Sequence, residues 1–203
     1  MKISSARRTP TSRIATFYDW VYPLYPLVDL FFAPGRRRLI ERVNQLPEGR
    51  LLEVGVGPGR HLSLYRRHEI VAIDCSAKMV VSAQHFAPHI DIRRMDGEAL
   101  DFPDASFNYV TLFHVLSVTS DPNRMLAEVR RVLRPEGRAF VLNHETQRNV
   151  WRYLDRAVVP LAGWMFFRSW FRLEEISNVK LFREMRMEAK GVLGQVKAQS
   201  LLK

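Results

Sequence analysis

The chain has 203 residues, of which 47% are hydrophobic and 26% are charged. This composition is typical of one globular domain with a buried core, and it excludes wholesale disorder. Lys and Arg together number 31 and Asp and Glu 21, so the net charge is +10. Such an excess points toward polyanionic partners: nucleic acid, an anionic membrane surface or phosphorylated substrates.

The cysteine content and the lengths of the apolar stretches indicate the cellular compartment. The single cysteine, Cys75, excludes an internal disulfide framework and a cysteine-cluster metal site, and no metal site is predicted. The basic stretch Met1–Arg13 is not followed by the apolar region of a signal peptide. The longest apolar stretches, residues 20–33 and 157–167, are shorter than the ~20 residues of a spanning helix. We predict a cytoplasmic protein that is soluble or peripheral on the inner face of the membrane.

Helical periodicity marks the N-terminal part of the chain. Apolar residues recur at the spacing of one helix face: Ile14, Phe17, Tyr18, Val21 and Tyr22. Pro23 ends or kinks this helix, Pro26 begins a second, and Pro34-Gly35 ends the second before a third over residues 36–45. We assign residues 1–45 to an N-terminal helical cap or membrane-facing segment.

Residues 46–203 alternate between strands and helices and are assigned to a single domain. Strands are predicted at residues 51–54, 70–73, 90–93, 107–113 and 138–142, the last after a turn at residues 135–137. Helices are predicted at residues 59–67, 76–85, 122–133 and 149–166. A closing hairpin is predicted from residues 179–187 and 192–200. Such alternation predicts a parallel sheet flanked by helices.

A glycine-rich turn follows the first predicted strand, in the run Leu51-Leu52-Glu53-Val54-Gly55-Val56-Gly57-Pro58-Gly59. Glycines let the backbone approach a ligand closely, and a helix N-terminus supplies N–H donors. A dinucleotide fingerprint would place its third glycine one residue later, where Arg60 stands. A tight turn that binds nothing is the alternative.

Two carboxylates follow the next two predicted strands. Asp74 lies 19 residues beyond Gly55, where an acidic side chain can accept hydrogen bonds from both hydroxyls of a ribose. The alternative is a helix N-cap supplied by Asp74 or Ser76. Asp96, in the turn Asp96-Gly97-Glu98, can accept from an adenine amino group.

These motifs, with the run Met125–Gly137, resemble the class I S-adenosylmethionine-dependent methyltransferases over residues 50–143. The resemblance implies a Rossmann-like α/β fold: a seven-stranded, mostly parallel sheet with helices on both faces and an antiparallel last strand. It implies S-adenosyl-L-methionine as the cofactor, with contacts from the following residues: Glu53, Gly55, Gly57, Gly59, Asp74, Ser76, Met79, Asp96, Gly97 and Glu98. It also implies that His114 faces the methyl donor. Arg60 and His61 depart from the family, because many members carry small residues there.

The acceptor decides whether catalysis needs a base. Methyl transfer is an in-line displacement on an activated sulfonium, so the protein mainly supplies alignment, and a base matters where the acceptor arrives as an ammonium. His114 and His144 follow the fourth and fifth strands, at the edge where open α/β sheets bind ligands. They are candidate catalytic residues with Tyr18, and a structural role is the alternative for both histidines. Tyr18 and Tyr25 are candidates to close over the site, or to pack as aromatic residues.

Arginines and aromatic residues flank the core. Arg148, Arg152 and Arg156 recur at helical spacing before the apolar segment 158–167. Such segments suit the plane of an anionic membrane, where each basic residue contributes about 1 kcal/mol. The alternative is that these faces pack on the sheet and the arginines are solvated. Tyr25, Arg148 and Arg152 are the candidate substrate-binding residues.

The flanks look like those of the small bacterial phosphatidylethanolamine N-methyltransferases. The matching features are the short length, residues 34–38, residues 116–122 and Leu142-Asn143-His144. The resemblance implies a lipid amine acceptor whose phosphate is held by arginine and whose nitrogen is deprotonated near His144 or a tyrosine. Glu145 departs from the aromatic residue usual at that position.

Other acceptors remain open. The core is also similar to quinone-biosynthesis C-methyltransferases, so C- or O-methylation of a quinone precursor or other small molecule is the alternative. Nucleic acid is not predicted as a partner, because the chain has neither a base-amine methylation motif nor an appended RNA-binding module. A hypothesis from a different functional class is a membrane-associated protein that binds the methyl donor without catalysing its transfer.

Overall fold

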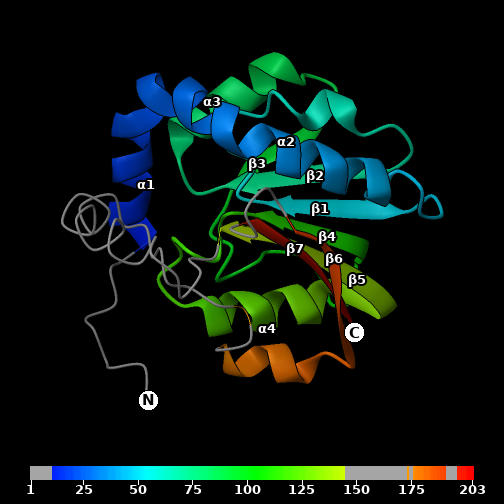
Figure 1. Ribbon diagram of the computed structural model, residues 1–203. Coiled ribbons are helices and arrows are strands. Elements are labelled where there is room, and N and C mark those ends of the chain that lie inside the picture. The colour runs from blue at the N-terminus through cyan, green and yellow to red at the C-terminus, as the bar shows by residue number, and fades with distance from the viewer. Residues whose placement is uncertain (1–10, 145–172, 174–175, 191–195) are drawn as a thin grey trace, which may run out of the picture.

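A twisted sheet organises the computed structural model (Figure 1). The structure describes residues 11–144, 173, 176–190 and 196–203, with backbone alone at Thr11, residues 24–31, His144, residues 184–190 and residues 196–198. Within these ranges the strands are β1 (Arg50–Val54), β2 (Glu69–Asp74), β3 (Asp91–Arg94), β4 (Phe107–Phe113), β5 (Leu133–His144), β6 (Glu184–Lys190) and β7 (Val196–Leu202). In the described chain these seven form one sheet in the order β3-β2-β1-β4-β5-β7-β6.

The strand directions confirm the predicted α/β architecture. β1 pairs in parallel with β2 and β4, and the same direction continues to β3 and β5. The last strand, β7, is antiparallel to both of its neighbours, β5 and β6. The apolar runs of β1 and β4 are buried on both faces, as central strands of a parallel sheet are.

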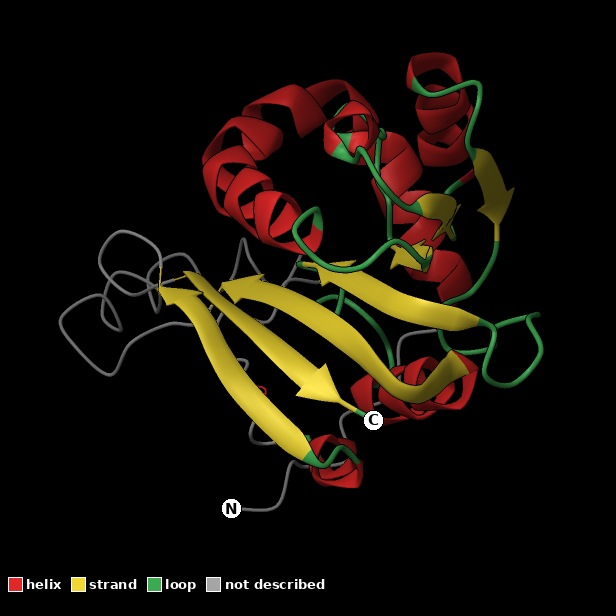
Figure 2. Ribbon diagram, turned by 90° about the vertical axis from the view of Figure 1, so that its right-hand side faces the viewer, coloured by secondary structure: helices red, strands yellow, loops and turns green. Residues whose placement is uncertain are grey.

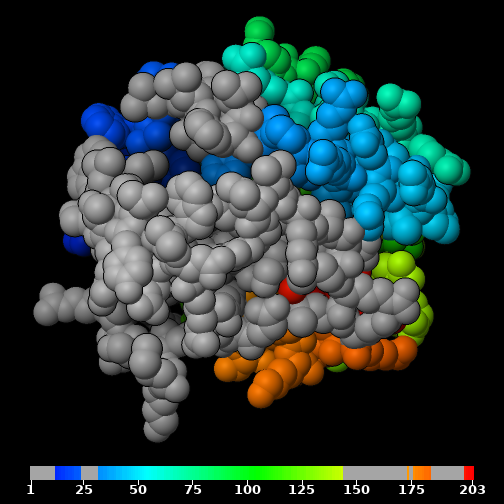
Figure 3. Space-filling view, viewed as in Figure 1, coloured from blue at the N-terminus to red at the C-terminus, as the bar shows by residue number. Residues whose placement is uncertain are grey.

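Helices cover both faces of the sheet, as predicted (Figures 1 and 2). The helical elements are α1 (Thr11–Val21), η1 (Tyr22–Leu24), α2 (Tyr25–Val43), η2 (Leu62–Leu64), α3 (Ala77–Phe86), α4 (Pro122–Val132) and η4 (Ser177–Leu181). α4 and η4 bury Leu126, Val129 and Val179 against one face. α2 and α3 bury Ile40 and Val80 against the other. The space-filling view shows α1 and α2, in blue, on the upper part of one side of the molecule and the orange segment that contains η4 below (Figure 3).

The predicted helix break at Pro34-Gly35 is wrong. The first helix does end near Pro23, where η1 replaces α-helix, but α2 then continues through Pro34 to Val43. A proline removes one N–H and disfavours the preceding turn. The C-terminal half of α2 nevertheless packs Leu39, Ile40 and Val43 into the core at 1% exposure or less. This burial outweighs the local cost of the proline.

The predicted helix over residues 59–67 is also wrong, because only the 3-10 turn η2 forms there. Tyr65 is extended, with φ −73° and ψ 140°. The side chain of Asn44, which directly follows α2, holds this path: its amide N–H donates to the Leu64 carbonyl at 2.8 Å, and its amide oxygen accepts from the Arg66 N–H at 3.1 Å. A long-range contact therefore replaces local helical bonds.

The C-terminal region matches its prediction in type and differs in bounds. β6 and β7 form the predicted hairpin, although residues 177–181 are the 3-10 helix η4. The predicted turn at residues 135–137 lies inside β5 as an irregularity, where the partner of β4 jumps from Leu133 to Arg138 and Glu136 has φ 62°. The predicted helix over residues 149–166 lies outside the described residues.

Gly59 yields a stability prediction. It has φ +77°, and a Cβ there would lie 2.5 Å from the Ala83 Cβ on α3. We expect Gly59→Ala to lower the free energy of unfolding by about 2–4 kcal/mol, because it adds both backbone strain and overlap. Urea denaturation measures this, with Ser63→Ala, an exposed position in the adjacent η2, as the control. Equal stability of the two variants would contradict the packing described.

Candidate functional site

A cavity of about 290 Å³ lies at the carboxyl edge of the sheet, bounded by α1, α2, the glycine turn and the loops after β2, β3 and β4. Ligands of open α/β sheets bind at this edge. The volume is near the lower end of small-molecule sites, roughly 300–1,000 Å³. The predicted site residues that line the cavity are Tyr18, Gly55, Gly57, Asp74, Met79, Asp96, Gly97, Glu98 and His114.

The glycine turn forms one wall because its backbone adopts conformations that side chains oppose. Gly55 and Gly57 have φ +75° and +58°. A Cβ on Gly55 would lie 2.9 Å from a methyl group of Val115. Gly59 does not line the cavity, since it packs against α3 instead. Its close contact with α3 gives it a role in loop packing, and its cofactor contact stays a prediction.

The Asp74 carboxylate connects two turns beside the cavity. One oxygen accepts from the Gly57 N–H and the other from the Ser76 N–H, both at 2.9 Å. Burial raises the pKa of Asp74 to about 6, although the two backbone donors oppose that shift. Ser76 supplies the N-cap of α3, where its hydroxyl accepts from the Met79 N–H at 3.2 Å. Ser76 is buried and does not line the cavity.

The turn after β3 forms the opposite wall. An Asp96 oxygen accepts from the Glu98 N–H at 2.9 Å. A Cβ on Gly97 would lie 2.7 Å from Val54, so only glycine fits between β1 and this turn. The Glu98 carboxylate accepts from the Thr119 hydroxyl at 2.5 Å and from two backbone N–H groups of residues 120–121. Glu98 therefore fixes the loop after β4 while lining the cavity.

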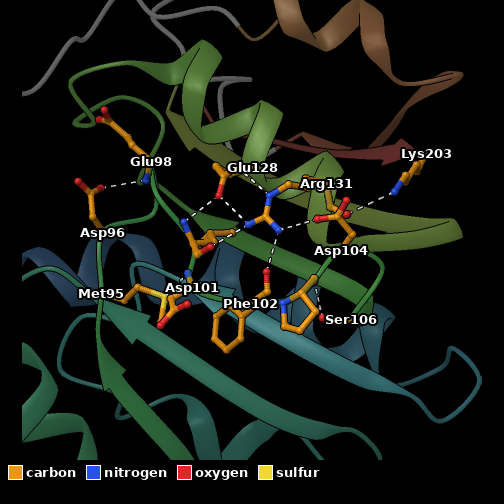
Figure 4. A network of polar contacts seen from close by, with 12 residues as sticks. Met95, Asp96, Glu98, Asp101, Phe102, Asp104, Ser106, Glu128, Arg131 and Lys203 are labelled. Carbon is orange, nitrogen blue, oxygen red and sulfur yellow. Dashed lines mark hydrogen bonds and ion pairs between the residues drawn. The ribbon is translucent and has the colours of Figure 1, made fainter.

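Arg131 on α4 holds the segment that follows this turn (Figure 4). Its guanidinium donates to the Leu100 and Phe102 carbonyls at 2.8 and 2.7 Å. It also pairs with Glu128 and Asp104, both at 2.8 Å. The hydrogen bond to Arg131 lowers the pKa of Glu128, which keeps that carboxylate charged and accepting from the Leu100 N–H. Residues 95–106 are thus anchored to the sheet's covering helix.

α1 lies over the cavity and is attached to α3. Residues of one α1 face line the cavity: Ile14, Phe17, Tyr18 and Val21. Asp19 accepts from the Ser76 hydroxyl and from the Lys78 N–H, the latter at 3.1 Å. Tyr22 donates to the Ser82 hydroxyl at 3.1 Å. Tyr18 is consequently held over the site, where the sequence predicted it.

The predicted acceptor residues are described to different extents. His114 has φ 59°, and its ring packs on Phe32 with centroids 4.0 Å apart. His144 ends β5 opposite Val196, at the same edge of the sheet, but its side chain is outside the described part of the chain. The side chain of Tyr25, at the start of α2, is likewise outside it, and so are Arg148 and Arg152 entirely.

The positions of Glu53, His61 and Arg36, all buried, differ from the predicted set of site residues. Glu53 does not line the cavity: its carboxylate lies 2.5 Å from His61 Nε2 and accepts from the Tyr65 hydroxyl at 2.7 Å. His61 and Arg36 do line it, and neither was predicted as a site residue. The only sequence signals were the unusual size of His61 after the glycine turn and the arginine run after Pro34-Gly35.

Cys75 also lines the cavity, and the structure gives it no reactive role. Burial, with the neighbouring Asp74 and Asp96 carboxylates, raises the pKa of its thiol to about 12. A thiol with so high a pKa stays protonated and is a weak nucleophile.

Comparison with known proteins identifies this arrangement. The methyltransferase domain family matches residues 52–141. A phosphatidylethanolamine N-methyltransferase of Cereibacter sphaeroides is 33% identical over 150 residues, which cover 70% of this chain and 73% of the relative. A demethylmenaquinone methyltransferase of Renibacterium salmoninarum is 32% identical over 163 residues, covering 74% and 69%.

A solved structure agrees on the fold. The Thermotoga maritima protein described as an S-adenosylmethionine-dependent methyltransferase, possible histamine N-methyltransferase, superposes with a TM-score of 0.74 at 21% identity, covering 93% of this chain and 99% of that one. The fold is that of the Rossmann-like methyltransferases. The chain belongs to the S-adenosylmethionine-dependent methyltransferases, and is an enzyme with S-adenosyl-L-methionine as its cofactor.

The raised pKa of Asp74 predicts how cofactor affinity depends on pH. A protonated carboxyl is a poorer acceptor for hydroxyl groups, so binding requires the ionised form. With a pKa of about 6, affinity should be constant above neutrality and about tenfold weaker at pH 5. Isothermal titration calorimetry measures this. Asp74→Asn should bind weakly at every pH, whereas the exposed control Asp101→Asn should follow the wild type. Undiminished wild-type affinity at pH 5 would contradict the role of Asp74.

Proposed function

We propose that the enzyme methylates the amine of phosphatidylethanolamine and of its N-methylated forms at an anionic membrane surface. The observation that carries this proposal is the aromatic wall of the cavity, where Phe17, Tyr18, Phe32 and Phe113 lie with His114 around the glycine turn. Aromatic faces attract ammonium groups, methylated ones included. The Cereibacter sphaeroides relative, named as a phosphatidylethanolamine N-methyltransferase, supports the same acceptor.

The residues present fit the cofactor. Asp74 would accept from the ribose hydroxyls and Asp96 from the adenine amino group, while Gly55 and Gly57 let the backbone approach. Arg36 is a buried cation on the cavity wall and would pair with the carboxylate of the methionine part. Other proposed contacts come from Met79, Gly97, Glu98 and His114. When bound, the cofactor supplies an electrophilic methyl group on a sulfonium.

The protein then has to align the acceptor and exclude water. α1 and the adjoining η1, attached to α3 through Asp19 and Tyr22 respectively, cover the cavity and place Tyr18 over it. Tyr18 and His114 would border the acceptor nitrogen, and alignment of that nitrogen with the methyl group supplies most of the rate. His144, Tyr25, Arg148 and Arg152 remain proposed acceptor residues.

Surface features of α1 and α3 support contact with a membrane. Trp20 on α1 is 61% exposed, and Val81 and Phe86 on α3 are exposed as well. Trp is favoured at the boundary between water and lipid, where the ring is half apolar. Lys78 and Arg60 lie in the same surface region as the α3 residues. No helix in the described part of the chain is long and apolar enough to cross a membrane.

A lipid methylation assay tests the proposal. The full chain is incubated with radiolabelled S-adenosyl-L-methionine and vesicles of phosphatidylethanolamine and phosphatidylglycerol, and the lipids are extracted and separated. We expect label in mono- and dimethylated phosphatidylethanolamine, with less when the anionic lipid is omitted or salt is added. Vesicles with phosphatidylcholine in place of phosphatidylethanolamine are the control, since their nitrogen cannot accept a methyl group.

The quinone alternative is decided in the same assay. The Renibacterium salmoninarum relative is named as a demethylmenaquinone methyltransferase, so a demethylated quinol is offered in parallel. Label in the quinol and none in the lipid would contradict the proposed acceptor.

A further inference from the structure

A buried polar cluster lies behind the glycine turn and reaches the cavity through one side chain. Glu53, on β1, is fully buried. One of its carboxylate oxygens lies 2.5 Å from His61 Nε2, and the other accepts from the Tyr65 hydroxyl at 2.7 Å. Tyr65 also contacts the Thr111 hydroxyl at 3.2 Å. Of Glu53, His61 and Tyr65, only His61 lines the cavity.

The partners of Glu53 define which nitrogen of His61 carries the ring proton. Burial and Glu53 raise the pKa of Tyr65 well above its ordinary value, so Tyr65 remains a hydroxyl donor. An ionised carboxylate only accepts, so the hydrogen bond from His61 places the ring proton on Nε2. Nδ1 then carries the lone pair. A carboxylate in this position fixes the orientation and the tautomer of the imidazole.

His61 lies near the predicted place of methyl transfer. Its ring meets the edge of Phe113, at the end of β4, with centroids 5.9 Å apart. It shares the cavity with Gly55 of the cofactor wall and with His114, which follows Phe113. A base at this wall can reach an acceptor that enters between the glycine turn and the end of β4.

We propose that His61 is the general base that deprotonates the acceptor, and that Glu53 is its positioning residue. The proposal rests on the proposed function, because a lipid amine arrives as an ammonium. His61 Nδ1 takes one proton from that ammonium. The freed nitrogen pair forms the N–C bond to the methyl group as the C–S bond breaks, and its electron pair stays on sulfur. The product is a methylated ammonium, and His61 later gives its proton to water.

The surroundings favour His61 over His114 for this step. The imidazolium formed on His61 is paired with the buried Glu53 carboxylate, whereas the ring of His114 packs on Phe32. The charged and titratable groups around His61 are Glu53 on β1, Arg36 on α2, Tyr65 after η2 and His114 after β4. Arg36 opposes the imidazolium, and the Glu53 carboxylate, 2.5 Å from His61 Nε2, offsets it.

Kinetics of His61→Gln test the proposal against an exposed control, His89→Gln. We expect the kcat of His61→Gln on phosphatidylethanolamine vesicles to fall about 100-fold or more at pH 7. Its rate should rise about tenfold per pH unit toward alkaline pH, because the fraction of free amine rises. Affinity for S-adenosyl-L-methionine should stay within about twofold of the wild type. Glu53→Gln keeps an acceptor for Nε2 without the charge and should show a smaller loss with the same pH trend.

Two kinetic results would overturn the proposal. One is an unchanged kcat for His61→Gln across the pH range. The other is a loss confined to cofactor affinity with full kcat at saturation, which would make His61 a binding residue. If His61→Gln does not fold, the pH dependence of kcat of Glu53→Gln is measured instead. A reduced kcat that rises with pH supports the proposal, and an unchanged kcat across the pH range overturns it.

The tautomer of His61 provides a test that needs no turnover. The full chain with ¹⁵N-labelled histidine is examined by NMR in complex with S-adenosylhomocysteine. A neutral ring protonated on Nε2 supports the base assignment, and protonation on Nδ1 overturns it. A wild type that labels a quinol and no lipid amine contradicts the proposed function, and the base assignment is then judged on the tautomer alone.

Discussion

The carboxylate of Asp74 joins the glycine turn to the start of α3, and the shape of this wall of the cavity depends on that connection. It accepts from the Gly57 and Ser76 N–H groups, which lie on the two sides of the cavity edge. The Gly55 N–H meanwhile donates to the Ile73 carbonyl at 2.9 Å, which seats the turn on β2. Burial raises the pKa of Asp74 to about 6, because its charged form loses solvation at this position.

Two further buried carboxylates, those of Glu98 and Glu53, are also surrounded by hydrogen-bond donors. A buried carboxylate without donors would be costly. Glu98 gathers donors from the loop after β4 and fixes the wall opposite the glycine turn. Glu53 gathers His61 and Tyr65 beneath that turn. The acidic residues of the motif thus divide their work: Asp74 and Asp96 present oxygen atoms to the cavity, while Glu53 and Glu98 position the groups around it.

Sequence patterns predicted the parts of the fold that local chemistry determines. β4 was predicted at its observed bounds, and six of its seven residues are buried, as expected of a central strand. The placement of Asp74 and Asp96 at strand ends followed from the alternation of strands and helices. Asp96 and Gly97 consequently reach the cavity wall as expected.

Tertiary contacts determine the helix bounds and side-chain pairings that the sequence patterns did not predict. α2 passes through Pro34 because the residues beyond it pack on the sheet, and η2 stays short because Asn44 ties down Leu64 and Arg66. The pairing of Glu53 with His61 had no local signal, since a helix was expected where the chain makes one tight turn. The packing of Gly59 on α3 was likewise not predictable from its motif position, whereas the N-cap role of Ser76 was among the alternatives.

The acceptor is the central claim, and lipid analysis of living cells tests it most directly. The chain is expressed in a bacterial host that makes phosphatidylethanolamine but no phosphatidylcholine, and the cells are fed methionine with a deuterated methyl group. Mass spectrometry of the extracted lipids should then show phosphatidylethanolamine carrying deuterated N-methyl groups, absent when Asp74→Ala is expressed. Unlabelled phosphatidylethanolamine beside newly labelled quinones would contradict the account.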